Sequence, residues 1–179
     1  MPRNRRPQDR EEKRAEIVAA ATTLFTQSGF DETSMAKVAA AAGVTTNTIY
    51  WYFNDKDALL VGVLDHVLDA ALAEAALEPE RPWVDQVLWA VDRLEQYRRL
   101  VTVVHARTAT SATIDSWHNE FHALMDTLLI NGFRRAGVPD SSLVPTAAIG
   151  VFVVEGLLMH PHVAKDRRAI VEALVASRS

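Results

Sequence analysis

Apolar residues recur along most of the chain at helical spacing, and no segment alternates apolar and polar residues with the period of two that is typical of strands. Residues 11–28 place an apolar stripe on one helical face, formed by Ile17, Ala21, Leu24 and Phe25, with Ser28 in line. Gly29 is expected to end this helix, with Phe30 as an apolar contact just beyond it. The pattern predicts a first helix with a single inner face.

Two short helices joined by a glycine turn are predicted next. Thr33 or Ser34 can cap the first, which has a narrow apolar face made by Met35, Val38 and Ala39. Gly43 can end it by adopting a positive φ, and Thr45 can cap the following helix at once. Two short helices with such a connection form a helix-turn-helix.

The second of these helices carries the stretch TTNTIYWYF, residues 45–53. Successive helical residues point about 100° apart, so no single core face can take four adjacent aromatic rings. Ile49 and Phe53 share the inner side, whereas Asn47 and Trp51 lie opposite. We therefore expect Trp51, together with Tyr50, to point away from the core.

The rest of the chain predicts further helices. A long one spans residues 56–77, the segment EPERP at residues 78–82 is the clearest break, and later helices cover residues 83–108, 113–136, 143–160 and 163–177. The expected fold is all-α, with a basic N-terminal arm at residues 1–10, a helix-turn-helix domain at residues 11–57 and a helical domain at residues 58–179.

Composition narrows the class of protein. With 179 residues, 49% of them hydrophobic, the chain can bury a sizeable core. The absence of cysteine excludes disulfides and thiolate metal sites. No signal peptide is recognisable and no later run is expected to reach transmembrane length, which favours a cytoplasmic protein. The net charge of −4 argues against a general polyanion binder.

The exposed helix suits the DNA major groove, which admits one helix and offers hydrogen-bonding base edges and thymine methyl groups. Asn47 can reach a base edge, Trp51 can pack on a methyl group or the backbone wall, and tyrosine hydroxyls can donate to phosphate. Lys56 begins the next helix, where the positive end of the helix dipole also favours phosphate. The alternative is that Trp51 packs on another domain or subunit.

The run AATTLFTQSGFDETSMAKVAAAAGVTTNTIYWYFNDKDALL resembles the DNA-binding domain of the tetracycline-repressor (TetR) family of bacterial transcriptional regulators. The resemblance implies a non-enzymatic, all-helical homodimer that binds a palindromic operator and is released from it by a small molecule. By resemblance, the residues that contact DNA are Thr33 or Ser34, Thr45, Thr46, Asn47, Thr48, Tyr50, Trp51, Tyr52 and Lys56. Tyr52 conflicts with the helical wheel, which turns it partly inward.

The C-terminal half indicates no cofactor and names no ligand. Its aromatic and large apolar residues could line a cavity for a small molecule or could be ordinary core. These candidates are Trp83, Trp89, Tyr97, Trp117, Phe121, Met125, Phe133 and Phe152. Recognition of a protein partner instead of a small molecule is a further alternative.

His118 and His122 are spaced i, i+4, so they can present two imidazoles to one metal, with Glu155, His160 or His162 as a third ligand. A metal-sensing regulator or a zinc hydrolase would use such a site. The stretch HNEFH departs from the HExxH protease pattern, which favours a solvent-facing or hydrogen-bonded histidine pair over a metal site.

Residues 143–160 are apolar almost all round and include several small residues, Ala147, Ala148, Gly150 and Gly156. We expect this helix and the last one to form a homodimer interface of four helices across a two-fold axis. A central helix buried within one subunit is the competing interpretation.

Overall fold

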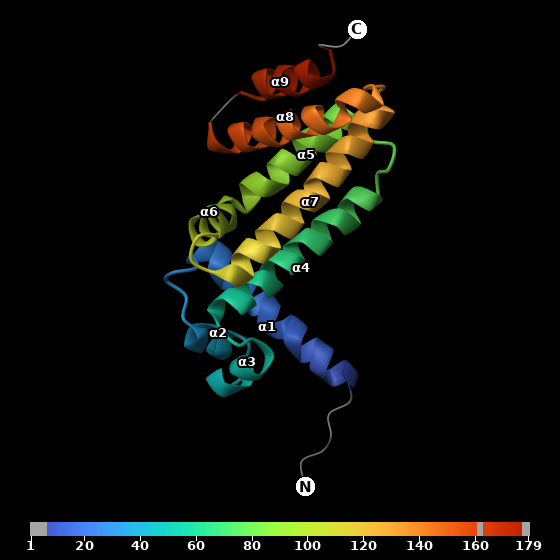
Figure 1. Cartoon of the computed structure of the whole chain (residues 1–179). Coiled ribbons are helices and arrows are strands. Elements are labelled where there is room, and N and C mark those ends of the chain that lie inside the picture. The colour runs from blue at the N-terminus through green and yellow to red at the C-terminus, as the bar shows by residue number, and fades with distance from the viewer. Residues whose placement is uncertain (1–6, 161–162, 177–179) are drawn as a thin grey trace. The chain divides into compact units, whose positions relative to one another are not determined.

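The structure, a computed structural model, describes residues 7–160 and 163–176, and within these ranges the chain forms nine helices and no strand (Figure 1). The first four are α1 (Pro7–Gln27), α2 (Met35–Ala41), α3 (Thr46–Tyr52) and α4 (Lys56–Ala76). The others are α5 (Trp83–Gln96), α6 (Arg98–Arg107), α7 (Ala112–Arg135), α8 (Asp140–Met159) and α9 (Ala164–Ala176). The all-α prediction is confirmed.

The chain divides into two compact units. Unit one consists of Met1–Leu72 and Arg99–Trp117, and unit two consists of Ala73–Arg98 and His118–Ser179. The backbone passes from one unit to the other within α4, at the start of α6 and within α7. Most of α6 therefore groups with the helix-turn-helix, whereas the sequence pattern places everything after residue 57 in the second domain.

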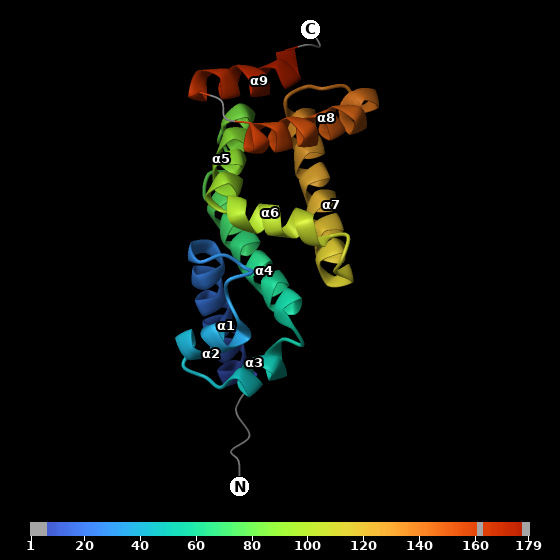
Figure 2. The ribbon, with the colours of Figure 1, turned by 90° about the vertical axis from the view of Figure 1, so that its left-hand side faces the viewer.

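The core of unit one is built from α1, α2, α3 and α4, which Figure 2 shows together. Ile17, Ala21 and Phe25 of α1 are fully buried, and the Phe25 ring meets Phe30 edge to face at 5.2 Å. The predicted inner face of α1 is confirmed at these three residues, whereas Leu24 is half-buried and Ser28 is exposed. The helix itself begins at Pro7, inside the segment expected to be an arm, and residues 1–6 lie outside the described ranges.

Two glycines and two hydroxyl caps determine where the helices of the helix-turn-helix begin and end. Gly29 and Gly43 have φ values of 94° and 64°, a region that favours glycine because it has no Cβ. The Ser34 hydroxyl accepts from the Lys37 N–H at the start of α2, and the Thr45 hydroxyl accepts from the Thr48 N–H at the start of α3. Each helix therefore starts where an orphan N–H finds a side-chain acceptor.

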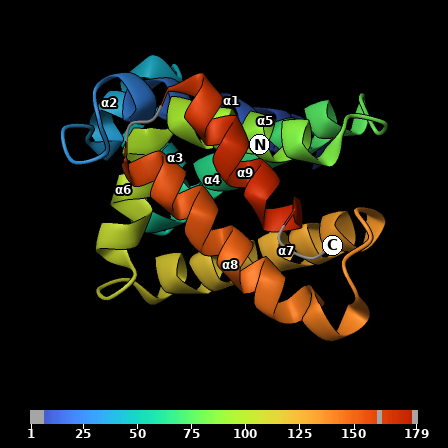
Figure 3. The same ribbon diagram turned by 90° about the horizontal axis from the view of Figure 1, so that it is seen from above.

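Unit two packs α8 and α9 against α5 and α7, and α9 runs along α8 in Figure 3. One buried cluster joins Val87 and Val91 of α5 to residues of α8 and α9, and a second surrounds Phe133 of α7. The Trp83 ring packs on the Phe133 ring with centroids 4.5 Å apart. Ion pairs between Arg167 and Asp92 and between Arg168 and Asp85 also connect α9 to α5.

The expectation of one continuous helix at residues 83–108 is wrong. The helix ends at Tyr97, whose N–H turns back to the Leu94 carbonyl in a tight last turn. Beyond this point the side chains find partners in unit one: Leu100 and Val104 are buried, and Arg99 donates to the Gln27 carbonyl at 2.6 Å. The change of packing partner explains the break.

The expectation that no run reaches transmembrane length is also wrong. The described residues contain one helix, α8, that is long and apolar enough to cross a membrane by length and composition. One side of this helix belongs to the core of unit two, where Leu143, Ala147, Leu157 and Leu158 are buried. The helices of soluble cores satisfy the same test, so this feature is weak evidence of a span.

The close contact between α5 and α7 yields a stability prediction. A Cβ at Gly132 would lie 1.8 Å from Trp83 Nε1, so Gly132→Ala forces the indole from its place beside Phe133. We expect a loss of about 1–3 kcal/mol in the free energy of unfolding, measured by urea denaturation. In a Trp83→Leu background the same change should cost nothing. An equal cost in both backgrounds would contradict the assigned contact.

Candidate nucleic-acid interface

The recognition segment α3 presents its aromatic residues on opposite sides. Ile49 and Phe53 are buried, with 0% and 4% of their surfaces exposed, whereas Tyr50 and Trp51 are 49% and 62% exposed. The predicted orientation of these four residues is confirmed. Large exposed rings side by side are typical of a binding surface rather than of a folded core.

Polar residues at the start of α3 lie beside these rings. Asn47 is exposed, and Thr46 is half-buried. The Thr45 and Thr48 hydroxyl oxygens are 2.9 Å apart, so these two side chains are held together by the cap of the helix. Asn47 is the residue of this group whose amide, with two donors and one acceptor oxygen, can best match a base edge.

Two arginines of α1, which belong to the basic N-terminal region but are not among the predicted DNA contacts, reach the same region. The Arg10 guanidinium lies 4.3 Å from the centre of the Trp51 ring, and that of Arg14 lies 5.0 Å from the Phe53 ring. Cation–π contacts of this kind place positive charge next to the exposed rings. The half-buried Tyr52 makes an edge contact with Trp51 at 4.8 Å, consistent with its partly inward position.

Lys56 begins α4 and covers an aromatic ring. Its Nζ lies 4.1 Å from the centre of the Phe30 ring and 3.5 Å from the Asp31 carbonyl oxygen. Burial, followed by the charge of nearby Arg107, lowers the pKa of Lys56, although Asp31 opposes this shift. The side chain is half-buried, so its ammonium group remains open to a partner on one side.

The alternative that Thr33 caps α2 is wrong, because Ser34 is the cap. Its side chain is fully buried, its hydroxyl donates to the Gly29 carbonyl at 2.8 Å, and its N–H donates to the Phe30 carbonyl. Both donors are therefore used within the turn after α1. Ser34, which is exposed and caps α2, is the member of the predicted pair left at the surface.

An ion pair connects α6 to the first turn of α4, next to Lys56. Arg107 Nη2 lies 2.8 Å from Asp57 Oδ2, and the Arg107 guanidinium also lies 5.2 Å from the Phe30 ring. Burial alone would raise the pKa of Asp57, but hydrogen bonds from Arg107 and Ser111 outweigh it and hold that pKa below its usual value. The hydrogen bond to Asp57, set against burial, raises the pKa of Arg107.

The residues considered for a ligand cavity have the following contacts. Trp83 packs on Phe133, and Trp89 donates to Glu74 at 3.3 Å beside the guanidinium groups of Arg81 and Arg93. Trp117 belongs to unit one, where it donates to Asp65 Oδ1 at 2.8 Å.

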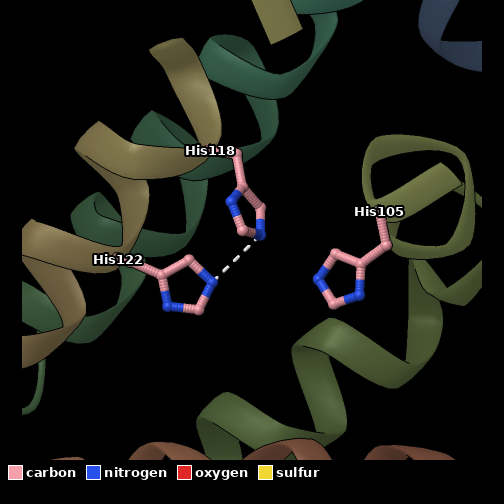
Figure 4. Close-up of side chains that lie close together, drawn as sticks. All are labelled: His105, His118 and His122. Atoms are coloured by element: carbon pink, nitrogen blue, oxygen red, sulfur yellow. Dashed lines mark hydrogen bonds between the residues drawn. The ribbon is translucent and has the colours of Figure 1, made fainter. Parts of the chain in front are cut away.

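The other cavity candidates also have separate surroundings. Tyr97 ends α5, Phe121 and Met125 are half-buried on α7, and Phe152 is 71% exposed on α8. Phe121 lies beside His122, with ring centres 5.9 Å apart. The two histidines considered as metal ligands are in contact, with His118 Nε2 and His122 Nε2 3.1 Å apart (Figure 4).

Comparison with known proteins identifies the family. Residues 17–63 match the family described as bacterial regulatory proteins, tetR family. The HTH-type transcriptional regulator TtgR of Pseudomonas putida is 30% identical over 172 residues, covering 86% of this chain and 82% of the relative. This chain belongs to the TetR family. It is therefore a helix-turn-helix transcriptional regulator, and TetR proteins are not enzymes.

Solved structures agree with this assignment. NalD, the secondary repressor of the MexAB-OprM multidrug efflux pump in Pseudomonas aeruginosa, is 26% identical with a TM-score of 0.64, and the match covers 93% of this chain and 95% of NalD. A transcriptional regulator from Saccharomonospora viridis, solved in complex with choline, has a TM-score of 0.75 at 16% identity, covering 94% and 97% of the two chains. The second likeness concerns the TetR fold alone.

The Asp57–Arg107 pair predicts a pH-dependent loss of stability. Asp57→Asn should lower the free energy of unfolding by about 1–3 kcal/mol near neutral pH, because it leaves Arg107 without its carboxylate partner. Since the folded pKa of Asp57 is depressed, this contribution is present above the unfolded value of about 3.9 and disappears as pH falls through the folded pKa.

The measurement is chemical denaturation of both proteins across pH. The difference between wild type and variant should shrink below about pH 4. Asp69→Asn, an exposed site on the same helix, is the control and should change stability by less than about 0.5 kcal/mol. A difference that is unchanged in acid, or equal in the control, would refute the role given to the ion pair.

Proposed function

We propose that this TetR protein is a homodimeric repressor that binds a palindromic operator through α3 and is released by a small molecule bound in its C-terminal helices. The observation that carries the proposal is the exposed face of α3, where Asn47, Tyr50 and Trp51 project from a helix anchored by Ile49. NalD, a repressor of a multidrug efflux pump, supports the direction of regulation.

The proposed contacts fall into two groups. Asn47 and Trp51 contact base edges and thymine methyl groups. The sugar-phosphate backbone of the DNA is contacted by Ser34, Thr45, Thr46, Thr48, Tyr50, Tyr52 and Lys56. Arg10 joins the second group because its charge lies over the Trp51 ring. Two recognition helices must stand about 34–36 Å apart to enter successive major grooves, so release needs only a change in their spacing.

The proposed route of release passes through α6. This helix begins where the backbone leaves unit two, and it holds unit one at two points, Arg99 on the Gln27 carbonyl and Arg107 on Asp57. Asp57 is adjacent to Lys56, a proposed phosphate contact. A displacement of α6 would therefore act on the start of α4, and operator and inducer would oppose each other by a coupling of about 1–3 kcal/mol.

The proposed dimer face lies on α8. Val144, Ala148, Phe152 and Met159 are exposed and follow one another at intervals that return to one side of a helix. Phe152 and Met159 are 71% and 72% exposed. Large apolar side chains left in contact with water in this way usually mark an interaction surface. A second copy with the same face would cover them across a two-fold axis, together with α9.

Base readout is tested by comparing two variants on two duplexes. Asn47→Ala should weaken binding to the operator by about 1–3 kcal/mol and leave binding to random duplex nearly unchanged. Lys56→Ala should weaken both and flatten the dependence on salt by about one unit. Fluorescence anisotropy across salt concentrations measures both quantities, and equal losses on the two duplexes for Asn47→Ala would exclude it from base readout.

The dimer face is tested by analytical ultracentrifugation. Phe152→Glu should raise the dissociation constant of the dimer by about 30-fold or more, because loss of an aromatic anchor costs about 2 kcal/mol or more. Leu77→Glu, at a residue that is 81% exposed outside the helices, is the matched control and should leave the dimer intact. A wild-type protein that stays monomeric at micromolar concentration would contradict both the proposed dimer and the binding of two successive major grooves.

A further inference from the structure

Two histidines of α7 direct the same ring atom at each other. His118 and His122 are four residues apart on one helix face, their ring centres are 4.4 Å apart, and their Nε2 atoms are 3.1 Å apart (Figure 4). Two ligands on one tetrahedral zinc, with Zn–N bonds of about 2.0–2.1 Å, lie about 3.3 Å apart. The pair therefore has the bite that a single metal ion requires.

A carboxylate from α8 lies next to this pair. Glu155 Oε1 is 3.9 Å from His122 Nε2, and both side chains are partly buried, with 40% and 29% of their surfaces exposed. For both groups to bind one ion, the distance between Glu155 Oε1 and His122 Nε2 would have to shorten by about 0.6 Å, which the torsions of a partly exposed glutamate can provide. The carboxylate also supplies the negative charge that a divalent cation needs in a half-buried place.

The packing of unit two holds the three residues in place. At Gly150, α8 packs on Leu129 and Phe133 of α7, because a Cβ there would lie 3.4 Å from both. His122 lies seven residues before Leu129 on α7, and Glu155 lies five residues after Gly150 on α8. Figure 2 shows α8 lying across α7, and the ligands stand on regular helices that hold them more precisely than loops do.

We propose that unit two binds a divalent transition-metal ion of the zinc type through His118 Nε2, His122 Nε2 and Glu155. Imidazole nitrogen and carboxylate oxygen suit such ions, whereas Mg²⁺ and Ca²⁺ prefer oxygen ligands alone. The site uses residues of unit two only, and His105, also drawn in Figure 4, belongs to unit one.

Three protein ligands leave a fourth position for water or for a coordinating group of an effector. The metal would then either act as the effector itself or help to hold one. This site goes beyond the proposed repressor function, and binding of the metal alone can be measured without operator DNA. Failure of one proposal therefore leaves the other standing.

The experiment titrates Zn²⁺ into the full-length chain without a histidine tag, after treatment with a chelator. Isothermal titration calorimetry measures affinity and stoichiometry, and Co²⁺ substitution reports coordination geometry through its visible absorption. The test variants are His118→Gln, His122→Gln and Glu155→Gln. His66→Gln, which removes an exposed histidine of unit one, is the matched control.

We expect roughly one Zn²⁺ per chain at micromolar affinity or tighter, a rise in melting temperature with Zn²⁺, and a Co²⁺ spectrum of low coordination number. Each test variant should weaken binding at least about tenfold, and the control should not. Equal melting temperatures in chelator, compared with wild type, establish that the variants are folded. Failure of the wild type to bind, unchanged affinity in both histidine variants, or an equal loss in His66→Gln would each overturn the proposal.

Discussion

The regulator depends on how a helix too short to be stable alone is held in one orientation. An isolated helix of seven residues such as α3 has too few hydrogen bonds to offset the cost of nucleation, so its stability comes from packing. Ile49 and Phe53 supply that packing. Gly62 of α4 leaves room for the Phe53 ring, because a Cβ there would lie 2.9 Å from the ring edge. Burial of these two residues decides which rings face outward.

The Phe30 ring connects the core of unit one to charged residues of α4 and α6. Phe30, which packs on Phe25 in the core, also receives the cations of Lys56 and Arg107 on its ring. Two positive groups at one ring repel each other, and the carboxylate of Asp57, in a direct ion pair with Arg107, offsets this repulsion. The charges at the beginning of α4 are therefore balanced by a contact with α6, and in the proposed release route a movement of α6 would disturb this balance next to Lys56.

Local signals were sufficient to predict most of unit one. Gly29, Gly43 and Thr45 act through their own backbone or an adjacent N–H, so a single sequence contains the information. The choice of Ser34 over Thr33 depended on which hydroxyl the turn buries, and this is a tertiary fact. The break at Tyr97 likewise follows from a change of packing partner that apolar periodicity does not record. Arg10 was missed because a basic terminus reads as an arm, although Arg10 and Arg14 stand i, i+4 on the same helix as Ile17.

The C-terminal half was harder to predict because α8 must satisfy several neighbours at once. Leu143, Ala147 and Leu157 enter the core, Gly150 allows contact with α7, and Phe152 remains outside. In the proposed dimer, α8 packs on the core with one side and on a second copy with the other, so it needs apolar residues nearly all round. This is why its composition resembles that of a membrane span. The second half of α8 contains one acidic side chain, Glu155, which interrupts the apolar pattern beside His122. Burying a charged side chain costs free energy unless a polar or ionic partner compensates it, and the histidine pair offers such a partner.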